Sequence, residues 1–347
     1  MAVLALAWRG CASRPGTATR ERERERERDE DRDEDRDEDR GEGRGRDGDR
    51  DDDAELERVR EEVRRHRPAP PPGKWLDVVA PAFTIPPNAS DAYCFVTHLP
   101  TAEPRAIRRW RSRMSAAIRD IVVFLGPAAP AQAPEVRRAP CGRLVAPQPS
   151  EALAYLSHTP TGELELPPSD GAGHPVAQLA EPGALLVVEI QIMNPTEREL
   201  PAELELHLEA ADPRIEVTPM SSVVAFHREL RIPAGTATAP GAATVTGRCA
   251  VPATLKLFGV SSYTHRRGVH TFAKDGGAAL FDSTAPDHPT MQAWWTGYSL
   301  TSGDLQYGCE YRNPGSQPVS LGSLPDAEVC LLIGYVFPAP RPILCPN

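Results

Sequence analysis

The sequence has few aromatic residues, 6% of its 347 residues, and it has no basic patch outside its first 66 residues. Few aromatics together with 37 prolines argue against a helical bundle and favour short strands joined by turn-rich loops. The net charge is −10, and residues 1–66 alone hold 17 basic and 23 acidic side chains. Without a basic surface in the rest of the chain, we do not expect nucleic-acid binding.

Signatures of several other classes are also missing. The chain has no GxSxG, HExxH or phosphate-loop motif. No stretch approaches the roughly 20 apolar residues of a transmembrane helix. The first eight residues, MAVLALAW, are apolar but short, with no basic residue among them. A secretory signal peptide is therefore poorly formed, and a misassigned start codon is an equal alternative.

Residues 1–73 predict a disordered leader. Arginine alternates with acidic residues through much of residues 20–53, and nothing apolar is present there to form a core. Leu56, Val59 and Val63 have helical spacing, so one short amphipathic helix is expected before the proline-rich linker of residues 67–73. The purpose of the charged leader does not follow from its sequence.

Beyond residue 73 the pattern is that of an all-β protein. The segment from 203 to 209 alternates strictly between polar and apolar residues, as a strand with one solvent-facing side does. Apolar runs of strand length, bounded by proline and glycine, occur at residues 118–124, 185–192, 255–260 and 329–337. Such strands predict β-sandwiches or jelly rolls. No internal repeat is evident.

Seven cysteines are present, and none forms a CxxC pair, which excludes zinc-ribbon and thioredoxin-like sites. Cys11 belongs to the leader. The other six permit three disulfides in an oxidising compartment, or they are separate buried thiols.

The C-terminal third contains five short motifs in a fixed order. They are FGVSSYTHRRG at 258–268, DHP at 287–289, GD at 303–304, CEYRN at 309–313 and DAEVC at 326–330. This order and spacing resemble the C-terminal domain of copper type II, ascorbate-dependent monooxygenases, the family of the peptidylglycine α-hydroxylating and dopamine β-monooxygenases. In the N-terminal half, DAYC at 91–94, AIRDIV at 117–122 and EIQIMNP at 189–195 resemble the corresponding first-domain segments.

The resemblance implies two tandem antiparallel jelly-roll domains, here residues 74–215 and 216–347. It also implies disulfides that pair Cys94 with Cys141, Cys309 with Cys330, and Cys249 with Cys345. A secreted or other extracytoplasmic location is expected from the family and from these cysteines.

The family activates O2 at two coppers, with ascorbate as the electron donor, and hydroxylates a C–H bond. At the first copper site the three histidine positions are occupied here by Arg119, Asp120 and Gln191. An arginine has no lone pair to donate and repels a cation. At the second site Tyr263 and Val329 replace a histidine and the methionine, so that His265 is the one retained ligand. Neighbouring positions Arg119 and Asp120 are expected to point to opposite faces of one strand and not to pair.

Other histidines offer little compensation. His270 is expected to face away from His265, and His288 is assigned to a structural turn. Isolated surface or core roles are the expectation for His98, His158, His174, His207 and His227. The sequence therefore predicts a catalytically degenerate member of this fold that acts in binding or scaffolding, with an unidentified small molecule or protein as partner and no firm cofactor. The alternative is a copper-dependent oxidoreductase with a remodelled metal site at His265.

Overall fold

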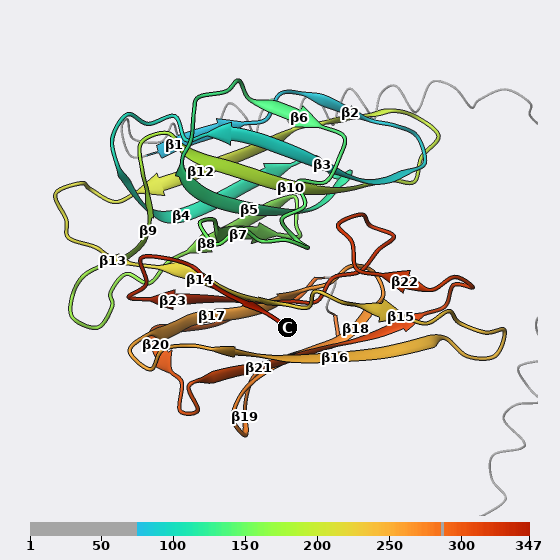
Figure 1. Cartoon of the computed structure of the whole chain (residues 1–347). Coiled ribbons are helices and arrows are strands. Elements are labelled where there is room, and N and C mark those ends of the chain that lie inside the picture. The colour runs from blue at the N-terminus through green and yellow to red at the C-terminus, as the bar shows by residue number, and fades with distance from the viewer. Residues whose placement is uncertain (1–74, 286–287) are drawn as a thin grey trace, which may run out of the picture. The chain divides into compact units, whose positions relative to one another are not determined.

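The computed structural model describes residues 75–285 and 288–347, which belong to one compact unit. In this part of the chain the secondary structure consists of strands, with no helix, and the expected all-β class is confirmed (Figure 1). The described residues therefore contain no helix that could cross a membrane. The leader, the short helix and the linker expected in residues 1–73 lie outside the described residues.

Residues 75–219 form two main sheets. The first has the strand order β1-β12-β4-β9-β13, with β8 added beside β4, and the second has the order β6-β3-β10-β5-β7. The first comprises β1 (Trp75–Val79), β4 (Arg105–Met114), β8 (Thr161–Glu165), β9 (Val176–Ala180), β12 (Leu204–Ala210) and β13 (Thr218–Pro219). The second comprises β3 (Ala89–His98), β5 (Ile118–Ala128), β6 (Glu135–Arg137), β7 (Ala152–Ser157) and β10 (Ala184–Asn194). We call these residues the first half.

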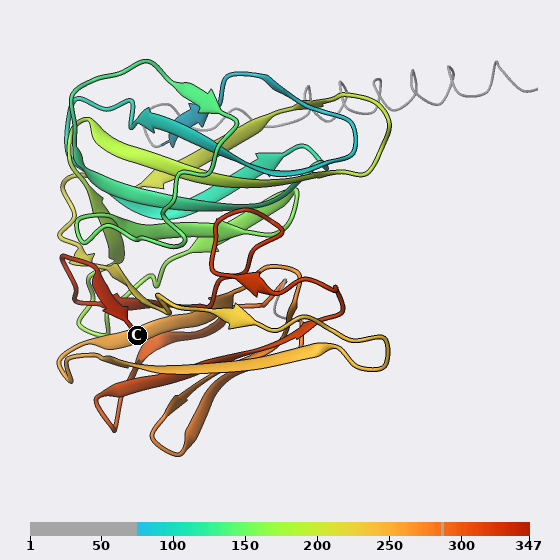
Figure 2. The same cartoon turned by 45° about the vertical axis from the view of Figure 1, so that its right-hand side comes forward.

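Residues 221–346 also form two main sheets, and we call them the second half. Their orders are β20-β17-β23-β14-β24 and β16-β21-β18-β19. The first comprises β14 (Ser221–Phe226), β17 (Lys256–Tyr263), β20 (Gln292–Ser299), β23 (Leu331–Phe337) and β24 (Ile343–Pro346). The second comprises β16 (Gly241–Ala250), β18 (Gly268–Asp275), β19 (Ala278–Ser283) and β21 (Asp304–Asn313). The turned view in Figure 2 shows the same layers from another side.

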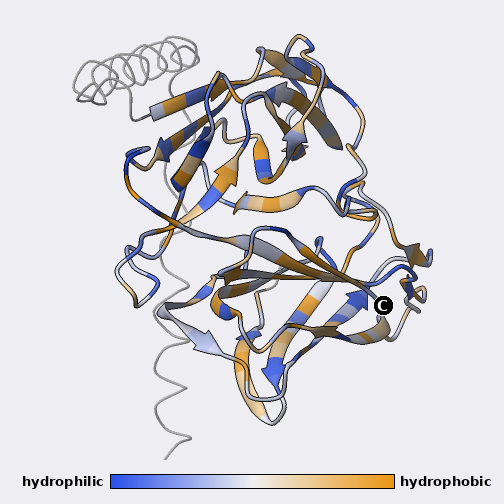
Figure 3. Ribbon diagram, turned by 60° about the vertical axis from the view of Figure 1, so that its left-hand side comes forward, coloured by the Kyte–Doolittle hydropathy of each residue, from blue (hydrophilic) through white to orange (hydrophobic). Residues whose placement is uncertain are grey.

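The five segments expected to be strands are all strands. The alternating segment is β12, whose residues are by turns buried and half-buried. In Figure 3, hydrophobic and hydrophilic residues alternate along several of the strands. By contrast, every residue of β23 is buried. Leu331, Ile333 and Tyr335 belong to a core shared with the first half, whereas Leu332 and Val336 belong to the core between the sheets of the second half. A strand that is buried on both faces requires a continuous apolar run, and this is what the sequence provides.

The two halves contain a repeated element that the sequence analysis missed. Asn194 ends β10 and Asn313 ends β21, and a proline follows each. The Asn194 side-chain amide donates to the carbonyls of Pro86 and Arg198, and the Asn313 amide donates to those of Pro233 and Gln317.

A two-stranded ribbon adjoins each of these asparagines. In the first half it is β2 (Phe83–Ile85) with β11 (Leu200–Ala202), and in the second it is β15 (Arg231–Ile232) with β22 (Val319–Ser320). The two halves thus share the arrangement of strands around a buried asparagine amide. They share too few residues there for a repeat to be visible in the sequence.

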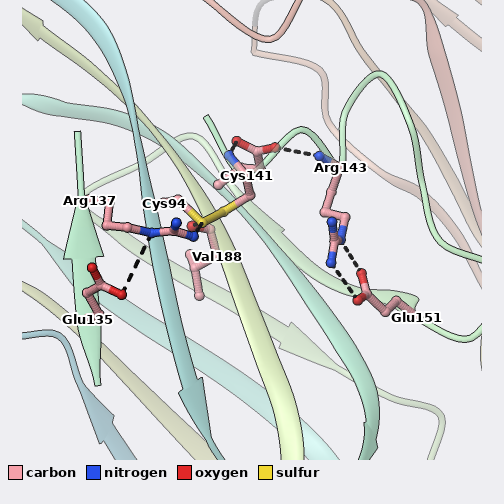
Figure 4. The surroundings of a disulfide bond; sticks show 8 residues. Cys94, Glu135, Arg137, Cys141, Arg143, Glu151 and Val188 are labelled. Carbon is pink, nitrogen blue, oxygen red and sulfur yellow. Dashed lines mark hydrogen bonds and ion pairs between the residues drawn. A yellow bond between two sulfur atoms is a disulfide. The ribbon is translucent and has the colours of Figure 1, made fainter. Parts of the chain in front are cut away.

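All three expected disulfides form. Their Cα–Cα distances are 4.9 Å for Cys94–Cys141, 5.3 Å for Cys249–Cys345 and 6.0 Å for Cys309–Cys330. The first bond ties β3 to the segment after β6, where Arg143 reaches Glu151 (Figure 4). The alternative of separate buried thiols is excluded for these six cysteines.

Candidate functional site

The positions that the resemblance assigns to two copper sites come together where the halves meet. Asp120 on β5 is the register partner of Gln191 on β10. Tyr263 ends β17 of the second half, and its hydroxyl donates a hydrogen bond of 2.7 Å to Asp120 Oδ1. A residue of the expected first site is therefore bonded directly to a residue of the expected second site.

Asp120 is almost fully buried, at 3% exposure. Burial raises the pKa of its carboxyl to about 6, although the Tyr263 hydroxyl and the Arg119 charge act in the opposite direction. Arg119 Nε lies 3.7 Å from Asp120 Oδ2, so the expectation that these neighbours cannot pair is wrong. The register along β10 shifts from Asp120 opposite Gln191 to Ile118 opposite Ile192. Arg119 thus occupies a β-bulge, where the strict alternation of side-chain directions breaks down.

His265 is held between β17 and β18 by the segment before β23. Its backbone N–H donates to Glu328 Oε2 at 2.9 Å, and its ring Nδ1 lies 2.9 Å from the Ala327 carbonyl oxygen. Since a carbonyl can only accept, the ring proton is on Nδ1 and the Nε2 lone pair is free. Nε2 is buried and has no hydrogen-bond partner among the described residues. Burial lowers the pKa of His265 to about 4, so the ring is neutral at pH 7.

The Glu328 side chain binds the backbone of the segment that contains His265. Its carboxylate is fully buried and accepts hydrogen bonds from the backbone N–H groups of His265 and Arg267, the latter at 2.7 Å. Burial raises the pKa of Glu328 to about 7 despite these bonds. Val329, at the position where the resemblance implies a methionine, packs in the shared apolar core. Its carbonyl accepts a hydrogen bond from the Tyr311 hydroxyl at 2.7 Å.

His158 is closer to this site than the sequence suggested. Its ring stacks on the Tyr263 ring, with 5.8 Å between the centroids. The centroid of the His288 ring lies 5.7 Å from that of His158. Only the fold could reveal this contact, because His158 follows the end of β7, 105 positions before Tyr263. His270 does face elsewhere, between Asp282 and Glu310.

The cavity at this junction is small. Its volume is about 30 Å³, and its lining includes Arg119, Asp120, Gln191 and His265. A volume of this order accommodates roughly one water molecule. The cavity therefore cannot admit an organic substrate.

The side chains at the six positions do not fit copper. The Gln191 amide donates to the Ser323 carbonyl at 2.8 Å, and the Tyr263 hydroxyl is bonded to Asp120. Val329 has no donor atom, and Arg119 has no lone pair. Within residues 75–285 and 288–347 there is no group of three or more histidine, cysteine, aspartate or glutamate side chains that could hold a metal ion. Of the six positions, His265 is the one that still offers an imidazole nitrogen with an available lone pair.

A larger cavity lies on another part of the surface between the halves. It measures about 400 Å³, within the range of small-molecule sites. The first half contributes Leu125, Gln178 and Glu181 to its wall, and the second half contributes Ser221 and Arg341. It combines apolar walls with one side chain of each charge.

Comparisons with known proteins do not add a family. No protein-family model matches the sequence, and no curated protein matches it. Among solved structures, one match is described as "Life in the extremes: atomic structure of Sulfolobus Turreted Icosahedral Virus", with 10% identity and a TM-score of 0.19. A second is described as "The Triple Jelly Roll Fold and Turret Assembly in an Archaeal Virus", with 11% identity and a TM-score of 0.17. The matches cover 76% and 78% of this chain, but only 56% and 61% of those chains.

Proposed function

We propose that this protein is a catalytically degenerate relative of the copper type II, ascorbate-dependent monooxygenases that acts by binding a partner outside the cytoplasm. The observation that carries the proposal is the hydrogen bond between Tyr263 and Asp120. It joins positions that belong to different copper sites in the family, and it engages the Tyr263 hydroxyl and one of the two Asp120 carboxylate oxygens.

The types of side chain at the six positions also support a degenerate copper site. Copper held in this family requires imidazole and thioether ligands, which suit its softness. Here an arginine, a carboxylate, an amide, a phenol and an aliphatic side chain occupy five of the six positions. With the adjoining cavity at about 30 Å³, there is neither a ligand set nor space for a substrate.

For the binding role we propose the cavity of about 400 Å³ as the ligand site. It lies apart from the degenerate copper positions, and both halves supply its walls. A small molecule with apolar surface and polar ends matches this lining, and a protein segment of similar chemistry is the other candidate. The three disulfides are compatible with an extracytoplasmic location.

A second candidate function rests on one atom. The free Nε2 of neutral His265 could bind a metal, so a remodelled oxidoreductase with a single metal site is the alternative. That site would need further ligands, and the other lone-pair donors in the same cavity are the oxygens of Gln191 and Asp120.

The two candidates are separated by metal content and oxygen use. The purified full chain should hold less than one copper per molecule after dialysis against excess copper, and it should not consume O2 with ascorbate beyond the rate of free copper. A His265→Ala variant should behave identically in both assays. One tightly held copper per chain that is lost in His265→Ala would establish the alternative and reject the degenerate assignment.

A further inference from the structure

The four asparagines of the chain occupy two different kinds of environment. Asn194 and Asn313 are buried, a proline follows each, and their amides are committed to backbone carbonyls. The Asn347 side chain accepts a hydrogen bond from the Arg248 backbone N–H and donates one to the Tyr307 hydroxyl. Asn88 differs from all three because Ala89 and Ser90 follow it, which makes Asn-Ala-Ser an acceptor sequence for N-linked glycosylation.

The position of Asn88 suits such a modification. It is exposed in the turn between β2 and β3, and Ser90 at the start of β3 is exposed as well. The backbone of Asn88 has a φ of 50°, a left-handed conformation that asparagine tolerates better than most residues. Its backbone N–H donates to the Thr196 carbonyl at 2.8 Å, which fixes the turn.

We propose that Asn88 is an N-glycosylation site. The donor would be a lipid-linked oligosaccharide pyrophosphate. A bond forms between Asn88 Nδ2 and C1 of the first sugar, the C1–O bond to the pyrophosphate breaks, the amide nitrogen gives up one proton, and the lipid pyrophosphate leaves. No change of oxidation state is involved.

The sequence pattern Asn-Pro-Thr at 194–196 provides an internal contrast. Proline at the middle position prevents recognition as an acceptor. In addition, the Asn194 side-chain oxygen accepts hydrogen bonds from the backbone N–H and the hydroxyl of Thr196. A glycan there would have to displace a buried amide, whereas a glycan on Asn88 extends into solvent.

The location of the glycan relative to the candidate site follows from the chain. Ser90, two residues after Asn88, is part of the lining of the small cavity that contains Arg119 and His265. Ser90 is also the register partner of Met193, whose side chain is 52% exposed. A sugar chain on Asn88 would therefore start close to this rim of the first half.

The inference rests on the extracytoplasmic location proposed above, so the experiment has two arms. The full chain is translated with microsomes that contain the oligosaccharyl transfer machinery, once as it stands and once behind a cleavable secretory signal. Protease protection reports whether the chain has entered the lumen. The first arm tests the location, and the second tests Asn88 regardless of it.

In the second arm we expect one discrete shift to higher mass, reversed by peptide N-glycosidase, with an aspartate left at the former asparagine. Asn88→Gln and Ser90→Ala should each lose the whole shift, and Ser90→Thr should keep it as the matched control. A protease-protected chain without the shift, or a shift that survives Asn88→Gln, would overturn the proposal.

Discussion

The Tyr263 hydroxyl donates to Asp120 Oδ1 at 2.7 Å, and this bond joins the last residue of β17 to the bulged part of β5. Both partners are buried, with Tyr263 at 1% and Asp120 at 3% exposure. The bond is thus a polar contact inside the interface between the two halves.

Replacing Tyr263 by phenylalanine should destabilise the protein by about 1–3 kcal/mol, because a buried carboxylate loses a charge-assisted hydrogen bond without a substitute. Urea unfolding at pH 7.5 measures this change. A double-mutant cycle with Asp120→Asn isolates the pairwise part. If Tyr263→Phe costs the same in the wild type and in Asp120→Asn, the two residues are not coupled and the contact is unimportant.

The second prediction concerns restoration of copper binding. The five replaced positions lie on or beside strands that bring them to one junction, with Gln191 opposite Asp120 and with Tyr263 in contact with Asp120. The variant combines Arg119→His, Asp120→His, Gln191→His, Tyr263→His and Val329→Met. If the resemblance is correct, it should bind copper tightly in solution, as equilibrium dialysis and metal analysis would reveal.

The matched control keeps the same five substitutions and adds His265→Ala. We expect it to lose one of the two bound coppers. A five-fold variant that folds, as circular dichroism and unfolding would show, but binds no more copper than the wild type would contradict the assignment of these positions.

The strands were predictable from the sequence pattern, and the disulfide pairs were implied by the resemblance. The junction between the halves was not predictable. The alternation in β12 indicates one buried face, and the continuous apolar run in β23 indicates two. Each pattern can be read within a single short segment of the sequence. The Arg119–Asp120 ion pair depends on a bulge, which is visible only in the register with β10. The stacking of His158 on Tyr263 depends on how the halves meet, and no local pattern encodes it.

The disulfides lead to the third prediction. Cys249 and Cys345 are 96 positions apart, whereas Cys309 and Cys330 are separated by 21. In the chain-entropy model the longer loop stabilises the fold by about 4–5 kcal/mol and the shorter by about 3 kcal/mol. Cys249→Ala/Cys345→Ala should therefore lower the unfolding free energy more than Cys309→Ala/Cys330→Ala.

Non-reducing peptide mapping is the companion measurement, and it should recover the three pairs of the structure. The matched double-alanine variants remove two sulfurs each, so the comparison between them reflects loop length and local packing. An inverted order of stabilities would mean that packing around Cys309 and Cys330, both 1% exposed, outweighs chain entropy.

The last prediction concerns the pH dependence of stability near neutrality. His270 on β18 lies between Asp282 on β19 and Glu310 on β21, with Nε2 and Nδ1 each 3.1 Å from a carboxylate oxygen. The hydrogen bond to Asp282 is the largest cause of the raised pKa of His270. Burial lowers this pKa, and the hydrogen bond to Glu310 raises it further. The ring packs beside Phe272 on the same strand.

A raised pKa in the folded state means that the fold binds the proton more strongly than the unfolded chain does. The stabilisation by His270 should therefore be complete below the unfolded pKa of about 6.5 and should be lost as the pH rises through the higher folded pKa. Unfolding free energies of the wild type and His270→Gln, measured from pH 5.5 to 9, test this directly. The difference between them should be largest at the acidic end, shrink with rising pH, and weaken in high salt because both carboxylates are exposed. Subtraction removes the contributions of His265 and His227, whose pKa values are lowered in the fold and act in the opposite direction. A difference that stays constant or grows with pH would show that the imidazolium of His270 is not stabilised by its two carboxylate neighbours.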